Sequence, residues 1–496
     1  MVASACAGGD ENGQTGSDAA GEPHELAIAA QSGPNSLDPA QLVDGQQMFV
    51  WASVLDTLLI RENNTGEILP NAAESWEYND EGTELTLRLR EDMTFSDGSG
   101  VDAHAVVATM LRNKETPGVI QEKFSDVADV VAEDDHTVVV HFDRHDPKFV
   151  PNLTMGTGAI GHPDTLEEER TATDPVGSGP YVLDVERSVD GSSYVLHKRD
   201  DYWNADAFPF ETVTVRVLQD PTAAFNALQA GEVNVAPVDS EVLPQLDTEQ
   251  YQINEIEAQA LMSLAIVDRA GENFPALGDL RVRQALNHAI DRQSILDNLL
   301  DGLGLVTQQI FSPYGEVYDE SLNDTYEYDP ELGRELVEEA GYAGETFEIP
   351  STYLTTSFES AISQAFEDVG LGVEWVPVAP QQAQSAHLSG DYGITFQMIG
   401  FLSDENDAYQ YYAPTGYVNP QRYADERIEE LFDAILTPDF EEALPAYREL
   451  NEYAVEQALT VPIAFIGSTW ASRDGVEMVD DGSSAIQSVR LFDVTE

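Results

Sequence analysis

Residues 274–295 read FPALGDLRVRQALNHAIDRQSI and are the most informative part of the chain. Apolar side chains recur in this stretch at i, i+3, i+4 and i+7, which predicts an amphipathic helix with one face on a core. Asp279 can cap the start of that helix and Gly302 can end it. Periodicity alone predicts a buried helix and leaves the function open. The residues that set the period are Val282, Ala285, Leu286, Ala289, Ile290, Leu296 and Leu299.

Other short motifs lie on either side of this stretch. Each is too short to identify a protein, but their order and spacing over most of the chain are highly specific. They are NSLDP at 35–39, LPNAAESW at 69–76, FSDG at 95–98, VGSGPY at 176–181, DYW at 201–203 and ALQAGE at 227–232. With RVRQAL at 281–286 and AIDR at 289–292, the chain resembles the family 5 solute-binding proteins that feed peptide and nickel ABC importers.

The resemblance implies an α/β protein with the two-lobed periplasmic-binding-protein fold (a Venus flytrap of type II, cluster C) and an extra inserted subdomain. Alternation of predicted strands and helices supports the α/β class, and about 475 ordered residues are too many for one core. The resemblance implies this division: a disordered lipoprotein tether at 1–21, lobe I at 22–54, 178–268 and 470–496, the inserted subdomain at 55–177, and lobe II at 269–469.

Local patterns predict individual elements of these lobes. Apolar and polar side chains alternate at 85–90 and 212–217, as in half-buried strands, and residues 25–30 read as the first strand. An Asp-Pro pair at 220–221 can start a helix that a glycine at 231 ends. The same arrangement recurs from Asp329 to Gly341.

The ligand is expected between the lobes, because clefts between domains are preferred ligand sites and hinged lobes can close over a solute. In peptide-binding members of the family, a Gly-Trp-x-x-Asp loop of the second lobe supplies a carboxylate for the peptide's α-ammonium. Gly400, Phe401 and Asp404 occupy that place here. A carboxylate and an ammonium form a charge-assisted hydrogen bond. Phe401 replaces the usual Trp, so the indole N–H is absent.

The same acidic stretch has a plainer interpretation. Residues 404–407 read DEND, and in so acidic a chain they can form a solvated loop. Three nearby tyrosines, Tyr409, Tyr411 and Tyr412, can line the ligand wall or belong to the core. Asp268 stands where relatives often have Asn, at the end of a strand that crosses between the lobes.

The first lobe contributes a loop that presents backbone and small polar groups to the ligand in relatives. Without the resemblance it is simply a glycine-containing loop. Its residues in this chain are Leu42, Asp44, Gly45 and Gln46.

The chain carries 91 acidic and 23 basic residues, a formal net charge of −68. Disorder does not follow from this charge, because 42% of the residues are hydrophobic and periodic segments run throughout. At about 0.1 M salt the screening length is ~10 Å and repulsion opposes compaction, whereas at molar salt it is ~3 Å. We therefore expect a protein of a salt-in, haloarchaeal organism; an ordinary acidic surface is the alternative. Nucleic acid is excluded as a partner by this charge.

The single cysteine, Cys6, cannot form an internal disulfide. Small residues precede it and a Gly/Ser/Asp/Glu linker follows, which resembles the end of a lipoprotein signal. Ala3 stands where the usual lipobox has Leu. We expect a lipid anchor at Cys6 that holds a monomeric receptor on the extracellular face of the membrane; an incidental cysteine in a disordered start is the alternative.

The function expected from the resemblance is that of a receptor, not an enzyme. It captures peptides by lobe closure, needs no cofactor or metal, and delivers the peptides to an ABC permease. A nickel chelate or a sugar oligomer is the alternative solute. A secreted hydrolase is the alternative of another class, but the sequence contains no Gly-x-Ser-x-Gly, His-Glu-x-x-His or phosphate loop. A sensory ligand-binding module is a third.

The charge predicts that folding requires salt. Lowering KCl from molar concentrations to about 0.1 M lengthens the screening distance and restores repulsion among the carboxylates. Circular dichroism should show reversible loss of the folded state and a melting temperature that rises with salt. A melting temperature that is the same at about 0.1 M and ~3 M KCl would contradict this expectation.

Overall fold

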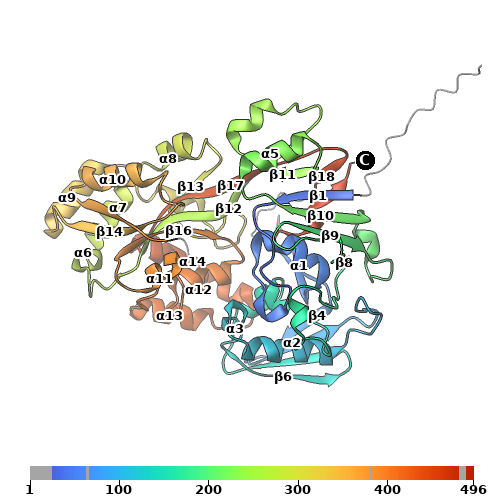
Figure 1. Cartoon of the computed structure of the whole chain (residues 1–496). Helices are drawn as coiled ribbons and strands as arrows, with labels where there is room; N and C mark the ends of the chain where they lie inside the picture. The colour runs from blue at the N-terminus through green and yellow to red at the C-terminus, as the bar shows by residue number, and fades with distance from the viewer. Residues whose placement is uncertain (1–24, 63–65, 380–381, 480–486, 496) are drawn as a thin grey trace, which may run out of the picture.

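The computed structural model describes residues 25–62, 66–379, 382–479 and 487–495. Two lobes lie side by side and are joined by two long strands, β12 (Gln252–Ile266) and β17 (Thr460–Ser472) (Figure 1). The strands run antiparallel and belong to one nine-stranded sheet that extends through both lobes. The predicted α/β, two-lobed architecture is confirmed.

The nine-stranded sheet is mixed. Its order is β16-β12-β17-β11-β1-β10-β9-β8, with β13 also paired to β17; β1 lies parallel to β10 and β11, and the other pairs are antiparallel. Besides the two long strands, its members are β1 (Glu25–Ala30), β8 (Tyr181–Leu183), β9 (Ser193–Lys198), β10 (Thr212–Val217), β11 (Val235–Pro237), β13 (Gly304–Val306) and β16 (Ile394–Gly400).

The long strands pass from one hydrophobic core to the other at an irregularity in their pairing. Ile256 pairs with Ser468 and Ala260 with Ile466, so residues 257–259 face a single residue, Gly467. A side chain at Gly467 would meet the carbonyl oxygen of Ile256, since a Cβ there would lie 2.0 Å from it. A glycine is therefore required at the place where the strands leave lobe I.

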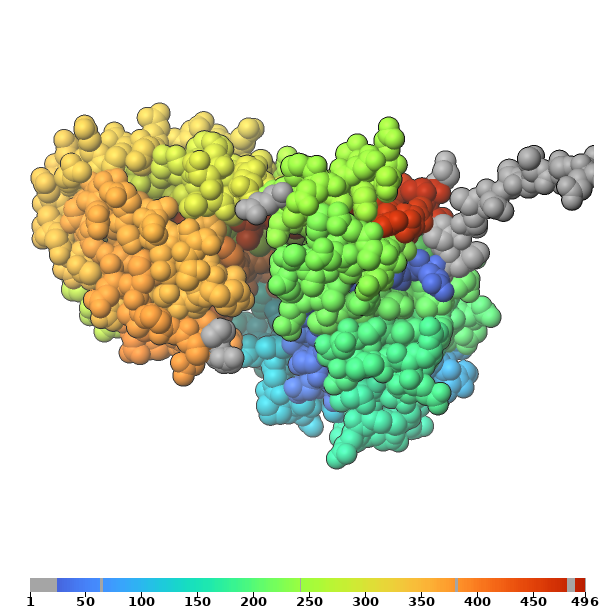
Figure 2. All heavy atoms as spheres, turned by 45° about the horizontal axis from the view of Figure 1, so that its top comes forward, coloured from blue at the N-terminus to red at the C-terminus, as the bar shows by residue number. Residues whose placement is uncertain are grey.

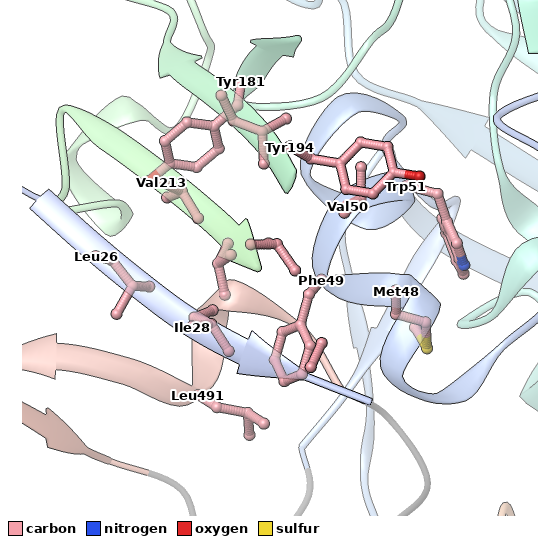
Figure 3. Packing of buried hydrophobic residues seen from close by; sticks show 14 of the residues in the cluster. Leu26, Ile28, Met48, Phe49, Val50, Trp51, Tyr181, Tyr194, Val213 and Leu491 are labelled. Atoms are coloured by element: carbon pink, nitrogen blue, oxygen red, sulfur yellow. The ribbon is translucent and has the colours of Figure 1, made fainter. Parts of the chain in front are cut away.

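Lobe I has its core between the sheet and helix α1 (Met48–Val54). Leu26 and Ile28 of β1, Phe49 of α1 and Leu491 point toward one another in Figure 3. Helix α5 (Pro221–Gln229) covers a second, smaller apolar cluster of the same lobe, and strands β18 (Val476–Met478) and β19 (Phe492–Val494) form a separate pair.

The inserted subdomain has its own core, formed by a four-stranded antiparallel sheet and helix α2 (Ala103–Glu115). Arg112 of α2 donates to both carboxylate oxygens of Asp38 in lobe I, at 2.5 and 2.8 Å, and ties the two units together. The other elements are β2 (Leu59–Arg61), β3 (Ile68–Pro70), β4 (Ala73–Tyr78), β5 (Glu84–Leu89), β6 (Val127–Asp134), β7 (Thr137–Phe142), α3 (Val119–Glu122) and α4 (Phe149–Asn152).

Lobe II buries both faces of its part of the sheet. Side chains of β12 alternate between two cores, with Met262 and Leu264 on one face and Leu261 and Ala265 on the other. Its elements are α6 (Pro275–Gly278), α7 (Leu280–Ala289), α8 (Arg292–Leu299), α9 (Pro330–Ala340), α10 (Glu359–Asp368), α11 (Ala383–Leu388), α12 (Asp404–Tyr412), α13 (Glu426–Ile435), α14 (Phe440–Glu456), β14 (Thr346–Ser351) and β15 (Gly372–Pro377).

The signature stretch forms α6, α7 and the first part of α8 instead of the single predicted helix. Asp279 caps α7 as expected by accepting the Arg281 N–H, but Asp291 starts a new helix, α8, by accepting the Ser294 N–H. The break allows the buried Arg292 to donate to the carbonyl oxygens of Thr307 and Pro462. The expectation of a continuous helix up to Gly302 is therefore wrong.

Most locally predicted elements are confirmed. Strands β1, β5 and β10 lie at the predicted positions within one residue, and both Asp-Pro pairs cap helices, α5 and α9. Gly333 of α9 has a packing role, because a Cβ there would lie 2.6 Å from a methyl carbon of Val369. The residue numbers at which the lobes divide stay a prediction.

Candidate functional site

Helix α12 begins where lobe II faces the rest of the molecule, and Figure 2 shows a hollow between the two lobes. The first turn of α12 carries the carboxylates of Asp404, Glu405 and Asp407, and Ser403 caps it. Asp404 and Asp407 are buried and Glu405 is half-buried. The interpretation of 404–407 as a solvated loop is therefore wrong.

The Asp404 carboxylate is held by a loop of its own lobe. Its Oδ2 accepts the backbone N–H groups of Glu316 and Val317, at 2.8 and 3.2 Å. Gly315 lies against Oδ1, since a Cβ on this glycine would be 2.2 Å from that oxygen. This loop was not predicted from the sequence, because a glycine followed by one acidic and one apolar residue is too common a pattern to identify a site.

The three carboxylates face one guanidinium from the opposite side of the cleft. Arg61, at the end of β2, exerts an attraction on Asp404, Glu405 and Asp407. Its Nε donates to the carbonyl oxygen of Gly66, and its Nη1 is buried without a hydrogen-bond partner among the described residues. Arg61 was not predicted from the sequence, because its attraction to these acids arises only when the fold brings the inserted subdomain near lobe II.

Burial dominates the electrostatics of this turn. A helix N-terminus favours anions, and the two backbone N–H groups also stabilise the Asp404 carboxylate. Nevertheless, burial raises the pKa of Asp404 to about 6 and the pKa of Glu405 to about 7. Burial, assisted by repulsion from Asp404, raises the pKa of Asp407 well above its ordinary value. The turn therefore holds three buried or half-buried acids near one arginine, and a bound cation would stabilise their ionised forms.

The predicted loop of lobe I lies partly in the structure's interior. Leu42 is fully buried in the lobe I core. Asp44 accepts the backbone N–H of Gly156 at 3.1 Å, and burial raises its pKa. Gly45 has a φ of 79°, which allows the turn, and Gln46 accepts the Gln31 N–H. These contacts fix the loop to the inserted subdomain and to β1.

The aromatic residues beside Asp404 are mainly core residues. Phe401 is 4% exposed and packs edge-to-face on Phe465. Tyr411 and Tyr412 are buried in the same core, as the more ordinary interpretation predicted. Tyr409 instead faces the inserted subdomain, where the Lys148 ammonium lies 4.8 Å from its ring centre.

Asp268 has a structural role that the sequence analysis did not assign. It is fully buried and accepts the backbone N–H groups of Glu272, Asn273 and Phe274. These bonds fix the turn that leads into the signature helices. Gly400 ends β16 opposite Ala260 and is exposed. Cys6, the predicted lipidation site, lies outside the described residues.

The cleft supplies buried acidic groups from lobe II and a half-buried arginine from the inserted subdomain. In the described ranges, no group of three His, Cys, Asp or Glu side chains is arranged to hold a metal ion. The helices of those ranges are too short or too polar to traverse a lipid bilayer. A sheet shared by two lobes, with buried charge between them, defines the class of two-lobed ligand-binding receptors.

Comparison with known proteins gives the family. Residues 67–421 match the family model described as bacterial extracellular solute-binding proteins, family 5. The chain belongs to this family. Its members are receptors that serve ABC transporters and are not enzymes, so the expected solute-receptor function is confirmed and the hydrolase alternative is wrong.

Similar proteins differ in what they bind. Heme-binding protein A of Haemophilus influenzae is 24% identical over 87% of this chain and 85% of its own length. Di/tripeptide-binding protein 1 of Pseudomonas aeruginosa is 26% identical over 64% of this chain and 63% of its own length. Among solved structures, the periplasmic binding protein DppA of Helicobacter pylori, in complex with the peptide STSA, superposes with a TM-score of 0.78 at 20% identity and covers 96% of this chain and 99% of that one.

The raised pKa values predict a pH dependence of stability. Because the folded state holds protons on Glu405 and Asp404 more tightly than the unfolded state, their stabilising contribution is present at acid pH and is lost as the pH rises through about 6 to 7. Glu405→Gln should reduce the loss of unfolding free energy between pH 5 and pH 8 by about 1–3 kcal/mol, at about 1.4 kcal/mol per pKa unit.

Denaturant unfolding in molar KCl at the two pH values measures this effect. Glu452→Gln, which removes an exposed carboxylate of α14, is the matched control and should leave the pH slope unchanged. If Glu405→Gln and Glu452→Gln have the same slope as the wild type, Glu405 does not carry the shift.

Proposed function

We propose that this receptor captures peptides with a free amino terminus and delivers them to an ABC permease. The observation that carries the proposal is the surplus of carboxylates at the start of α12, at the position that resembles the ammonium-binding aspartate of peptide-binding relatives. Both backbone N–H groups that hold Asp404 use its Oδ2; its Oδ1, against which Gly315 packs, is the proposed acceptor for a ligand ammonium. The peptide-binding relative from Pseudomonas aeruginosa supports the same solute class.

The loop at 42–46 is proposed to present the lobe I side of this site, with Gly400 and Phe401 beside Asp404 on the lobe II side. Phe401 supports the turn from within the core and excludes water from it. The heme-binding relative supports the second candidate, a non-peptide solute such as a nickel chelate or a sugar oligomer. The buried acid favours the peptide, because an ammonium compensates carboxylates and a neutral sugar does not.

The environment of the receptor is proposed to be concentrated brine outside a haloarchaeal cell, where it acts as a monomer. The net charge of −68 supports this habitat, since molar salt screens the repulsion. The sequence before Cys6 and the polar linker behind it support a thioether lipid anchor. One lipid group binds a membrane only marginally, so a second chain or the permease contributes to retention.

Substitution of Asp404 tests the peptide site. Asp404→Asn should weaken binding of a free-amino-terminus peptide by about 1.5–3 kcal/mol, the range for a hydrogen bond to a charged group, which is roughly ten- to a hundred-fold in Kd. An acetylated peptide should bind the wild type poorly, and Asp404→Asn should discriminate less between the two forms. Calorimetric titration in molar KCl measures both.

Glu452→Gln serves as the control for this experiment, because it removes one carboxylate without touching the cleft. Glu405→Gln is unsuitable, since Glu405 is half-buried next to Asp404. Equal affinities of Asp404→Asn and the wild type would remove Asp404 from the site and favour a non-peptide solute.

The anchor has a separate test. Mass spectrometry of the N-terminus of protein isolated from its native membrane should find a lipid on the sulfur of Cys6. An unmodified Cys6, or an N-terminus that begins after this residue, would refute the anchor.

A further inference from the structure

A cavity lies between the inserted subdomain and lobe II, beside the acidic first turn of α12. The Asp404 carboxylate is not part of its lining. Its volume is about 200 Å³. A single water needs only about 10–15 Å³ of such space, so the cavity can hold a small organic group. Trp76 and Tyr78 of β4 line one side, and Glu405, Phe440 and Tyr447 line the other.

The lining combines aromatic faces with one carboxylate. Four aromatic side chains, Trp76, Tyr78, Phe440 and Tyr447, contribute to the wall, and prolines and aliphatic side chains form most of the remainder. Aromatic faces attract cations, and more strongly when the cation is desolvated. The same contact between the inserted subdomain and lobe II already contains such a pair, with the Lys148 ammonium over the Tyr409 ring.

A polar group in this wall has no partner in the protein. Tyr447 is fully buried, and among the described residues its hydroxyl makes no hydrogen bond. The hydroxyl lies near enough to Glu405 for that carboxylate, together with burial, to raise the pKa of Tyr447. An unsatisfied buried hydroxyl costs about 1–3 kcal/mol, which a hydroxyl group on a bound molecule would recover.

The charge of Glu405 is also left without a close counter-ion. In the described parts of the chain, no cationic side chain forms an ion pair with Glu405 within 4.0 Å. Arg61 attracts it from farther away, and Asp404 repels it. His145, also in the wall, does not supply the charge, because burial lowers its pKa and keeps the ring neutral.

We propose that this cavity is a subsite for an organic cation whose charge is surrounded by alkyl groups, such as a methylated ammonium. A primary ammonium needs acceptors for three N–H donors, whereas Glu405 is the one carboxylate among the described lining residues and most of the others are aromatic or apolar. A methylated ammonium needs only a counter-charge and apolar or aromatic contact. The inference rests on the receptor function of the family and not on the solute being a peptide.

The experiment uses choline and its neutral isostere 3,3-dimethylbutan-1-ol as probes of the whole protein in molar KCl. Choline should raise the melting temperature and give a measurable Kd by calorimetry, while the isostere should bind at least ten-fold more weakly. Glu405→Gln and Trp76→Leu should each weaken choline binding ten-fold or more, and Glu452→Gln should not change it. The two variants act on opposite walls, so one remains informative if the other fails to fold.

Two outcomes would overturn the subsite. The first is the absence of any choline effect on the wild type at 0.1 M choline, and the second is equal binding of choline and the isostere. Titration of the same proteins with a free-amino-terminus dipeptide separates this proposal from peptide capture. Loss of peptide binding in Asp404→Asn with choline binding retained would support two distinct subsites; choline binding that is lost in Asp404→Asn but retained in Glu405→Gln would assign the cation to Asp404 and refute the subsite.

Discussion

The antiparallel pairing of β12 with β17 is the interaction on which the whole molecule depends. These two strands extend from lobe I into lobe II, so both lobes share one sheet. Their backbone hydrogen bonds hold the lobes together, while the irregular pairing at 257–259 interrupts the ladder between the two cores. Gly467 is needed there because its neighbour's carbonyl oxygen occupies the space of a side chain. Separate cores on either side of an interrupted ladder are the arrangement that a hinge between two lobes requires.

The signature helices attach lobe II to this pair of strands. Arg283 donates to the carbonyl oxygens of Leu277 and Gln457, and Arg292 donates to those of Thr307 and Pro462. Both guanidinium groups are buried, so each must have its donors satisfied. The arginines of the family signature thus donate to backbone carbonyl oxygens of other segments, including Gln457 just before β17 and Pro462 near its start. A helical period does not reveal such contacts, because they are made with residues far away in the chain.

Helices and strands were predictable from the sequence where a local pattern determines them. The contacts around Asp404 were not, because they join segments far apart in the chain. Period-two alternation and Asp-Pro caps located β10 and α9, because those signals act within a few residues. The break in the signature helix depended on a buried arginine reaching another element, which no local period reveals. Asp404 was found through resemblance, whereas Arg61 and Gly315 face it only after folding, from segments 343 and 89 residues away in the chain (404 − 61 and 404 − 315).

Salt screens the carboxylates on the protein surface more strongly than it screens the buried carboxylates of α12. Surface carboxylates repel one another over a distance that molar salt shortens to ~3 Å. The carboxylates of α12 are withdrawn from that solvent, and a ligand cation in contact with them is screened much less. A highly acidic surface and a buried acidic site are therefore compatible, because salt screens exposed charges much more than charges withdrawn from solvent.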